Sequence, residues 1–170
     1  MKAIRFIGMF LALIYGCRQA DENKLTTDLD FSIYLTTDSL VNTDLVLNNL
    51  VMETKPFIKY GDIISYDSAK HILELNYKVD TIFKYNYRLD RRGFVAVMNN
   101  TTKIYCGTFW SPAHSDINSN IAITLPIDGI SNDSCLKIIA GHPNTSYNKG
   151  YSIVNDKRII ELFKKDRKIK

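Results

Sequence analysis

The fold is decided by residues 93–110, whose sequence reads GFVAVMNNTTKIYCGTFW. Two runs rich in β-branched and aromatic residues, 93–98 and 103–110, flank the polar segment 99–102, Asn-Asn-Thr-Thr. Such runs around a short polar turn predict a β-hairpin. This hairpin is the strongest in the chain, and it places the middle of the protein in a β-sheet.

Shorter strands are predicted on both sides of this hairpin. They lie at residues 31–36, 63–66, 71–75, 121–125 and 136–140. The second and third form another hairpin, whose last strand places His71, Leu73 and Leu75 on one face. Residues 79–89 fit either a strand or a short helix. The pattern predicts a mainly β (or α+β) fold: a single antiparallel β-sheet, sandwich or barrel-like domain.

One α-helix is predicted at the C-terminus, capped by Asn155 or Asp156. An apolar stripe formed by Ile159, Ile160, Leu162 and Phe163 lies opposite lysines, so the helix is expected to pack on a face or an open end of the sheet. Residues 156–170 hold seven basic and three acidic side chains. The sequence favours a solvated helix face for these charges over a surface for anionic lipid or lipopolysaccharide phosphates.

The amino-acid composition is typical of a globular protein. Of its 170 residues, 45% are hydrophobic and 24% are charged, and the formal net charge is +4. There is no internal repeat or low-complexity tract, so one domain is expected. A basic stripe with interleaved aromatic residues is also missing from the sequence, which argues against nucleic acid as a partner.

The first 17 residues have the pattern of an export signal. Lys2 and Arg5 precede a ten-residue apolar run, 6–15, which is too short to span a membrane as a helix. The string Leu-Ile-Tyr-Gly-Cys, residues 13–17, resembles a bacterial lipobox, although Tyr15 is bulkier than the residue usual there. The resemblance implies lipidation of Cys17 and anchoring to a membrane. The alternative is a secretory signal cut elsewhere, with Cys17 an ordinary thiol.

The segment after the cysteine suggests where the protein resides. Residues 19–22, Gln-Ala-Asp-Glu, resemble the acidic surface-export signal of lipoproteins in one large group of Gram-negative bacteria. The resemblance implies a lipid-anchored protein of the outer membrane that faces the cell surface; the alternative is its periplasmic face. The chain is therefore divided into a signal peptide, 1–16, a flexible tether, 17–28, and a β-rich domain, 29–170.

The domain itself resembles a group of small secreted or lipid-anchored bacterial proteins. The resemblance rests on segments 60–67, 71–75, 93–95, 104–111 and 141–143 and extends over most of residues 31–165. That group has no established activity, so the resemblance implies one compact exported domain and assigns no catalytic residue.

A loop after the strongest strand is the best candidate site. Trp110, His114 and Asp116 lie within seven positions, and an aromatic ring beside polar groups suits a glycan or a peptide. A Trp that only anchors the loop to the core is the competing interpretation. His142, at another strand end, approaches His114 if the two loops share a rim. His71 is interpreted as a buried, hydrogen-bonded histidine rather than a catalytic base.

Catalytic and metal-binding motifs are missing from the sequence. The three histidines have no metal-ligand spacing, and no nucleophile or phosphate-loop signature occurs, so neither a metal nor a cofactor is predicted. Export permits a disulfide between Cys106 and Cys135, while their strand-like surroundings favour two buried thiols.

These patterns favour a surface lipoprotein that binds a glycan, a peptide or an envelope protein. One alternative is an envelope hydrolase that uses His71, His114 or His142 with a carboxylate. The other is an inhibitor or immunity protein that blocks an incoming enzyme.

Overall fold

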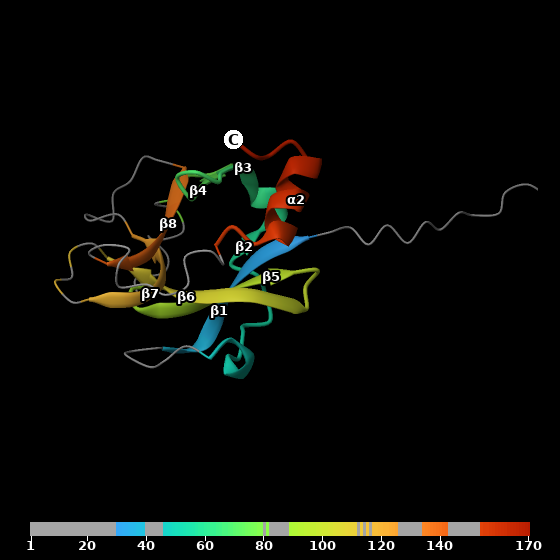
Figure 1. Cartoon of the computed structure of the whole chain (residues 1–170). Helices are drawn as coiled ribbons and strands as arrows, with labels where there is room; N and C mark the ends of the chain where they lie inside the picture. Colours follow the sequence, from blue (N-terminus) through green and yellow to red (C-terminus); the bar gives the residue numbers. More distant parts are fainter. Residues whose placement is uncertain are drawn as a thin grey trace, which may run out of the picture.

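The computed structural model describes residues 30–39, 46–79, 81, 89–111, 113, 115, 117–125, 134–142 and 154–170. They form mainly β structure with one C-terminal α-helix, which confirms the predicted fold class (Figure 1). The strands are β1 (Phe31–Ser39), β2 (Ile58–Lys59), β3 (Ile63–Asp67), β4 (Ile72–Leu75), β5 (Arg92–Met98), β6 (Thr102–Trp110), β7 (Asn118–Thr124) and β8 (Cys135–His142). The helices are the 3-10 helices η1 (Leu47–Asn49) and η2 (Tyr60–Asp62) and the α-helix α2 (Lys157–Lys165). The segments 1–16 and 17–28, and most of 79–89, lie outside the described residues.

The predicted central hairpin is present as β5 and β6. Its turn contains Asn99 and Asn100, both with positive φ, at 52° and 59°. Asparagine tolerates this left-handed conformation better than most residues, which explains why two of them make the turn. The second predicted hairpin is β3 and β4, where His71, Leu73 and Leu75 are buried as expected. His71 itself has a φ of 56° and is the last residue of the turn rather than the first of the strand.

The eight strands form one curled sheet in the order β2-β1-β5-β6-β7-β8-β4-β3. Neighbouring strands pair antiparallel except β6 and β7, which run parallel with Gly107 opposite Ile121. The sheet is therefore mixed rather than purely antiparallel. The seven residues 111–117 make the crossover, although parallel strands usually need a dozen or more.

The two edges of the sheet approach each other at η2. β2 and β3 are the edge strands, yet only the three residues of η2 separate them in the chain. The Lys168 ammonium stabilises this corner by donating to the carbonyls of Tyr60 and Ile63, at 2.9 and 2.6 Å. The backbone of Tyr66 on β3 also bonds to Lys168 and Lys170, so the C-terminal residues cover the outer edge of β3. The result is a barrel-like half-closed sheet.

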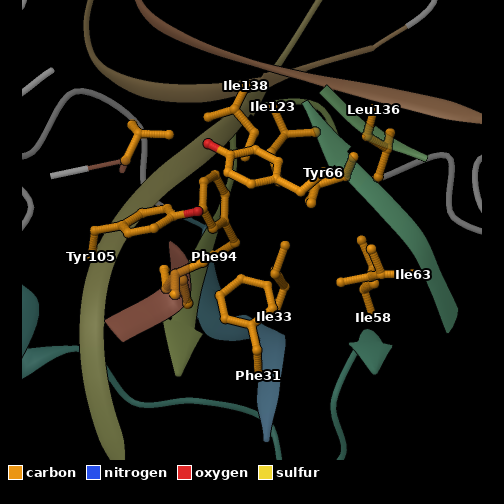
Figure 2. Close-up of a cluster of buried hydrophobic side chains, with 14 of the residues drawn as sticks. Phe31, Ile33, Ile58, Ile63, Tyr66, Phe94, Tyr105, Ile123, Leu136 and Ile138 are labelled. Carbon is orange, nitrogen blue, oxygen red and sulfur yellow. The ribbon is translucent and has the colours of Figure 1, made fainter. Parts of the chain in front are cut away.

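Aromatic and aliphatic side chains fill the inside of the curled sheet (Figure 2). Phe94 is fully buried and packs edge-on against Phe109 and Tyr105, with ring centroids 5.6 and 6.3 Å apart. The core therefore occupies the space that larger barrels leave for a ligand.

The helix α2 packs between β1 and the edge strand β3, at the half-open side of the sheet. Asp156 caps it by accepting from the Arg158 amide at 2.9 Å, as predicted for one of the two candidate caps. Phe163 is fully buried and contacts aromatic rings of Phe31 on β1 and Tyr66 on β3. The helix is thus part of the core.

A smaller apolar cluster lies on the opposite face of β1, β5 and β6. Tyr34, Val95 and Val97 are buried there beneath Leu47, Leu50 and Met52. Among the described helices, none is long and apolar enough to cross a membrane.

Candidate functional site

Trp110 ends β6 on the face of the sheet opposite the main core. The side chain of Phe109, the preceding residue, points into the main core, and that of Trp110 points to the other face. Trp110 is nevertheless only 7% exposed. The Arg91 guanidinium lies over its ring, 5.7 Å from the centroid. Arg91 has a φ of 62° and donates its backbone N–H to the Phe109 carbonyl at 2.8 Å, which places it beside the end of β6. Arg91, rather than the indole, is therefore the more exposed group at this rim.

The crossover after Trp110 is held at both of its ends. The Ser111 amide donates to the Asp90 carboxylate at 3.2 Å. At the other end, the Asn118 side chain is buried and donates from Nδ2 to the Thr108 hydroxyl at 3.1 Å. Ile117 is 58% exposed. Polar contacts therefore hold both ends of the crossover, and the apolar side chain of Ile117 is exposed just before β7.

The other predicted site residues are placed only in part. His114 and Asp116 lie outside the described residues, and so does the His142 side chain. The backbone of His142 is paired with Asn118, the first residue of β7. This pairing brings the end of β8 to the end of the crossover.

A second polar cluster joins the β3–β4 turn to the start of α2. The Tyr66 hydroxyl lies 2.8 Å from Asn155 Oδ1 and 3.2 Å from His71 Nδ1. Asn155 Nδ2 donates to the Ser68 carbonyl at 3.0 Å. His71 is 6% exposed, so it is a buried, hydrogen-bonded histidine, as the sequence predicts. The contacts with Tyr66 and Asn155 were not predicted because Asn155 is 84 positions away from His71 in the sequence.

The hydrogen bonds in this cluster orient the Tyr66 hydroxyl between Asn155 and His71. Because Asn155 Nδ2 faces a carbonyl, its Oδ1 faces Tyr66 and accepts the single phenolic proton. The phenol oxygen is then the acceptor that Nδ1 of His71 meets when this nitrogen carries a proton.

His71 should make the stability of the domain pH-dependent. Burial lowers the pKa of His71, against the opposing effects of the Asp67 charge and the Asn155 hydrogen bond. Because the unfolded chain binds this proton near pH 6.5, stability is greatest above that pH and decreases as pH falls toward the lower folded-state pKa. Asparagine tolerates the positive φ at position 71 and does not titrate in this pH range. His71→Asn should therefore weaken the decrease in stability at low pH. Urea unfolding of the unsubstituted protein and of His71→Asn at pH 5.5 and 7.5, on either side of about 6.5, measures the change in stability. The same pH dependence in the two proteins would contradict the prediction.

The two cysteines of the domain lie on different strands. Cys106 is half-buried on β6 and Cys135 is exposed at the start of β8, and the structure holds both as thiols. β7 separates the two strands, so their backbones are about 10 Å apart, whereas a disulfide needs Cα atoms within about 7 Å. The geometry therefore favours thiols over a disulfide, but the expectation that both are buried is wrong for Cys135, which is exposed at the start of β8.

Alkylation rates should separate the two thiols. Burial raises the pKa of the Cys106 thiol, with the Lys103 charge acting in the opposite direction. Cys135 is exposed, so iodoacetamide should modify it much faster than Cys106. Mass spectrometry of a Cys17→Ser chain follows both rates without reductant. A mass shift that appears only after reduction would instead indicate a disulfide.

The described part of the chain contains no group of three or more His, Cys, Asp or Glu side chains that could hold a metal ion. Comparison of the sequence and structure with protein-family models, curated proteins and solved structures finds no match.

Proposed function

We propose that the protein is a lipoprotein of the outer membrane, facing the cell surface, that binds a glycan, a peptide or an envelope protein. The lipobox-like residues 13–17 and the acidic residues 19–22 support the anchor and the location. The filled interior of the curled sheet supports binding on the outer surface. Because Phe94, Phe109 and other core side chains occupy the inside, a ligand contacts the rim and the loops.

The rim around the end of β6 is the proposed contact. Arg91 and Trp110 stack there, and arginine and tryptophan are the residue types that most often dominate binding energy. His114 and Asp116 follow in the same crossover and His142 ends the strand beside it, so these residues belong to the same proposal. The Asp90 contact to Ser111 fixes the start of the crossover, which lowers the entropic cost of ordering it on binding.

Lipidation is tested at Cys17. Replacing it by alanine should abolish incorporation of labelled palmitate, because the thiol carries the first acyl chains. Protease treatment of intact cells, with a periplasmic protein as the control for intact envelopes, should remove the domain. Palmitate retained by Cys17→Ala would refute the anchor, and digestion only after lysis would move the domain to the periplasm.

Binding is tested with a photo-crosslinking residue at Ser115, an exposed position of the crossover, on intact cells. The crosslinked product should disappear in a Trp110→Ala, His114→Ala double variant that remains folded. Arg91→Ala should weaken it while leaving the indole in place, and Arg158→Ala on α2 is the matched control. Unchanged crosslinking in both rim variants would exclude this rim.

A further inference from the structure

Residues 168–170 lie along β3 as a short additional strand, here called the strap (Figure 1). Ile169 pairs with Tyr66 in a parallel bridge. The Tyr66 amide donates to the Lys168 carbonyl at 2.7 Å, and the Lys170 amide donates to the Tyr66 carbonyl at 2.9 Å. Because β3 is an edge strand, the strap takes the place that a strand of another chain would occupy there.

The end of α2 directs the strap onto β3. Arg167 has a φ of 56°. Its amide donates to the Lys164 carbonyl at 3.1 Å, and the Lys168 amide donates to the Phe163 carbonyl at 2.8 Å. These two bonds form the Schellman pattern, in which a residue in the left-handed conformation ends the helix. Glycine is the usual residue at that position, so the turn that closes the strap is one that arginine adopts at a cost.

Two lysine side chains fasten the strap near the surface. The Lys168 ammonium, which bonds to two carbonyls of the η2 corner, also lies 4.0 Å from the centroid of the Tyr60 ring. Lys170 Nζ lies 2.5 Å from Glu74 Oε2, and these two side chains are 59% and 34% exposed. Exposed ion pairs contribute little to stability. Because few contacts hold the strap, it can open while the rest of the domain stays folded.

β3 is the longer of the two edge strands of the sheet. β2 has two residues, Ile58–Lys59, whereas β3 has five, Ile63–Asp67. The side chain of Ile64 on β3 is 51% exposed. The strap forms its bridge with β3 at Tyr66, so a second five-residue strand could pair with more of β3 than the strap does. An edge of this length with an exposed apolar side chain is the kind that pairs with another chain when it is uncovered.

We propose that β3 is an interaction surface for a second copy of this chain, and that the strap controls access to it. When the strap opens in two copies, two identical edges are exposed. Identical strands can pair antiparallel about a two-fold axis, so each copy contributes the same residues to the contact. A closed strap opposes this pairing because its attachment to α2 gives it an effective concentration in the millimolar range. The inference goes beyond the proposed rim site and does not depend on the lipid anchor.

The test compares variants of the chain from residue 17 with Cys17→Ser, in reductant so that the exposed Cys135 forms no crosslink. Lys170→Pro removes the amide that bonds to Tyr66. Lys170→Gln is the matched control, because it loses the same charge beside Glu74 and keeps the amide. A strapless chain ends at Arg167, and a second version of it carries Ile64→Lys. Sedimentation velocity over a concentration series measures association, and thermal unfolding confirms that each variant is folded.

We expect the unsubstituted strap and Lys170→Gln to favour the monomer and the strapless chain to dimerise. One lost hydrogen bond should shift the closed-to-open equilibrium of the strap by about tenfold. Because both copies must open, the dimer dissociation constant of Lys170→Pro should be about 100-fold below that of Lys170→Gln. Ile64→Lys places like charges on the two paired edges, so it should return the strapless chain to the monomer.

Hydrogen exchange locates the contact. In the strapless dimer, dilution to the monomer should accelerate exchange of the β3 amides. A folded strapless chain that stays monomeric, or a dimer that Ile64→Lys leaves intact, would overturn the proposal. If the strapless chain does not fold, the two Lys170 variants still decide, since equal dissociation constants for them would also overturn it.

Discussion

Gly107→Ala is expected to destabilise the domain by about 3 kcal/mol, the upper end of the range for overpacking. A Cβ at this position would lie 2.2 Å from the Ile121 carbonyl oxygen and 2.7 Å from the Phe94 ring. The first contact involves the backbone of the parallel partner strand, which can move only if the β6–β7 pairing shifts. For a domain of this size, a loss of that magnitude lowers the melting temperature by roughly 10 °C.

Gly61→Ala is the matched control, because a Cβ there meets nothing within 4 Å. It should be neutral, or stabilise by up to about 1 kcal/mol through the unfolded chain. Urea unfolding of both variants gives the comparison. Phe94→Leu in the Gly107→Ala background relieves the ring contact and leaves the carbonyl contact, so it should not restore stability. Equal stability of the two alanine variants would contradict this account of the close strand approach.

The local elements of this fold can be predicted from the sequence, while the contacts between distant elements cannot. Alternation and turn residues predict β1, both hairpins, β7, β8 and α2, because each of these depends on periodicity within about ten residues. The parallel direction of β7 relative to β6 depends instead on the pairing of two strands that a seven-residue connection joins. The pairing of residues 168–170 with β3 likewise brings together residues about 100 positions apart.

The same division applies to the candidate site. The burial of His71 could be predicted, since it shares a strand face with Leu73 and Leu75. Its partners could not, because Asn155 reaches Tyr66 only after α2 has docked. Trp110 ends a predicted strand beside the loop, but its stacking under Arg91 depends on the turn before β5, and no sequence spacing links the two residues.

Phe163→Ala is expected to destabilise the domain by about 3–5 kcal/mol, as truncation of a fully buried aromatic residue does. The Phe163 ring contacts Phe31 on β1, Tyr60 in η2 and Tyr66 on β3, with centroids 5.2 to 5.8 Å apart. These three residues lie on β1, which is next to the edge strand β2, on the edge strand β3, and on the corner η2 between the two edges. Losing the ring therefore removes the packing that holds β1, η2 and β3 to α2.

The loss should spread beyond the cavity that the ring leaves. The Tyr66 amide donates to the Lys168 carbonyl at 2.7 Å, and this bond depends on the docked end of α2. Hydrogen exchange of the Tyr66 amide should therefore accelerate in Phe163→Ala by more than it does in Ile160→Ala. Ile160 lies on the same helix but is only partly buried, so its truncation should cost less in urea unfolding. Equal unfolding free energies and exchange rates for the two variants would show that α2 is an appendage and that the sheet closes without it.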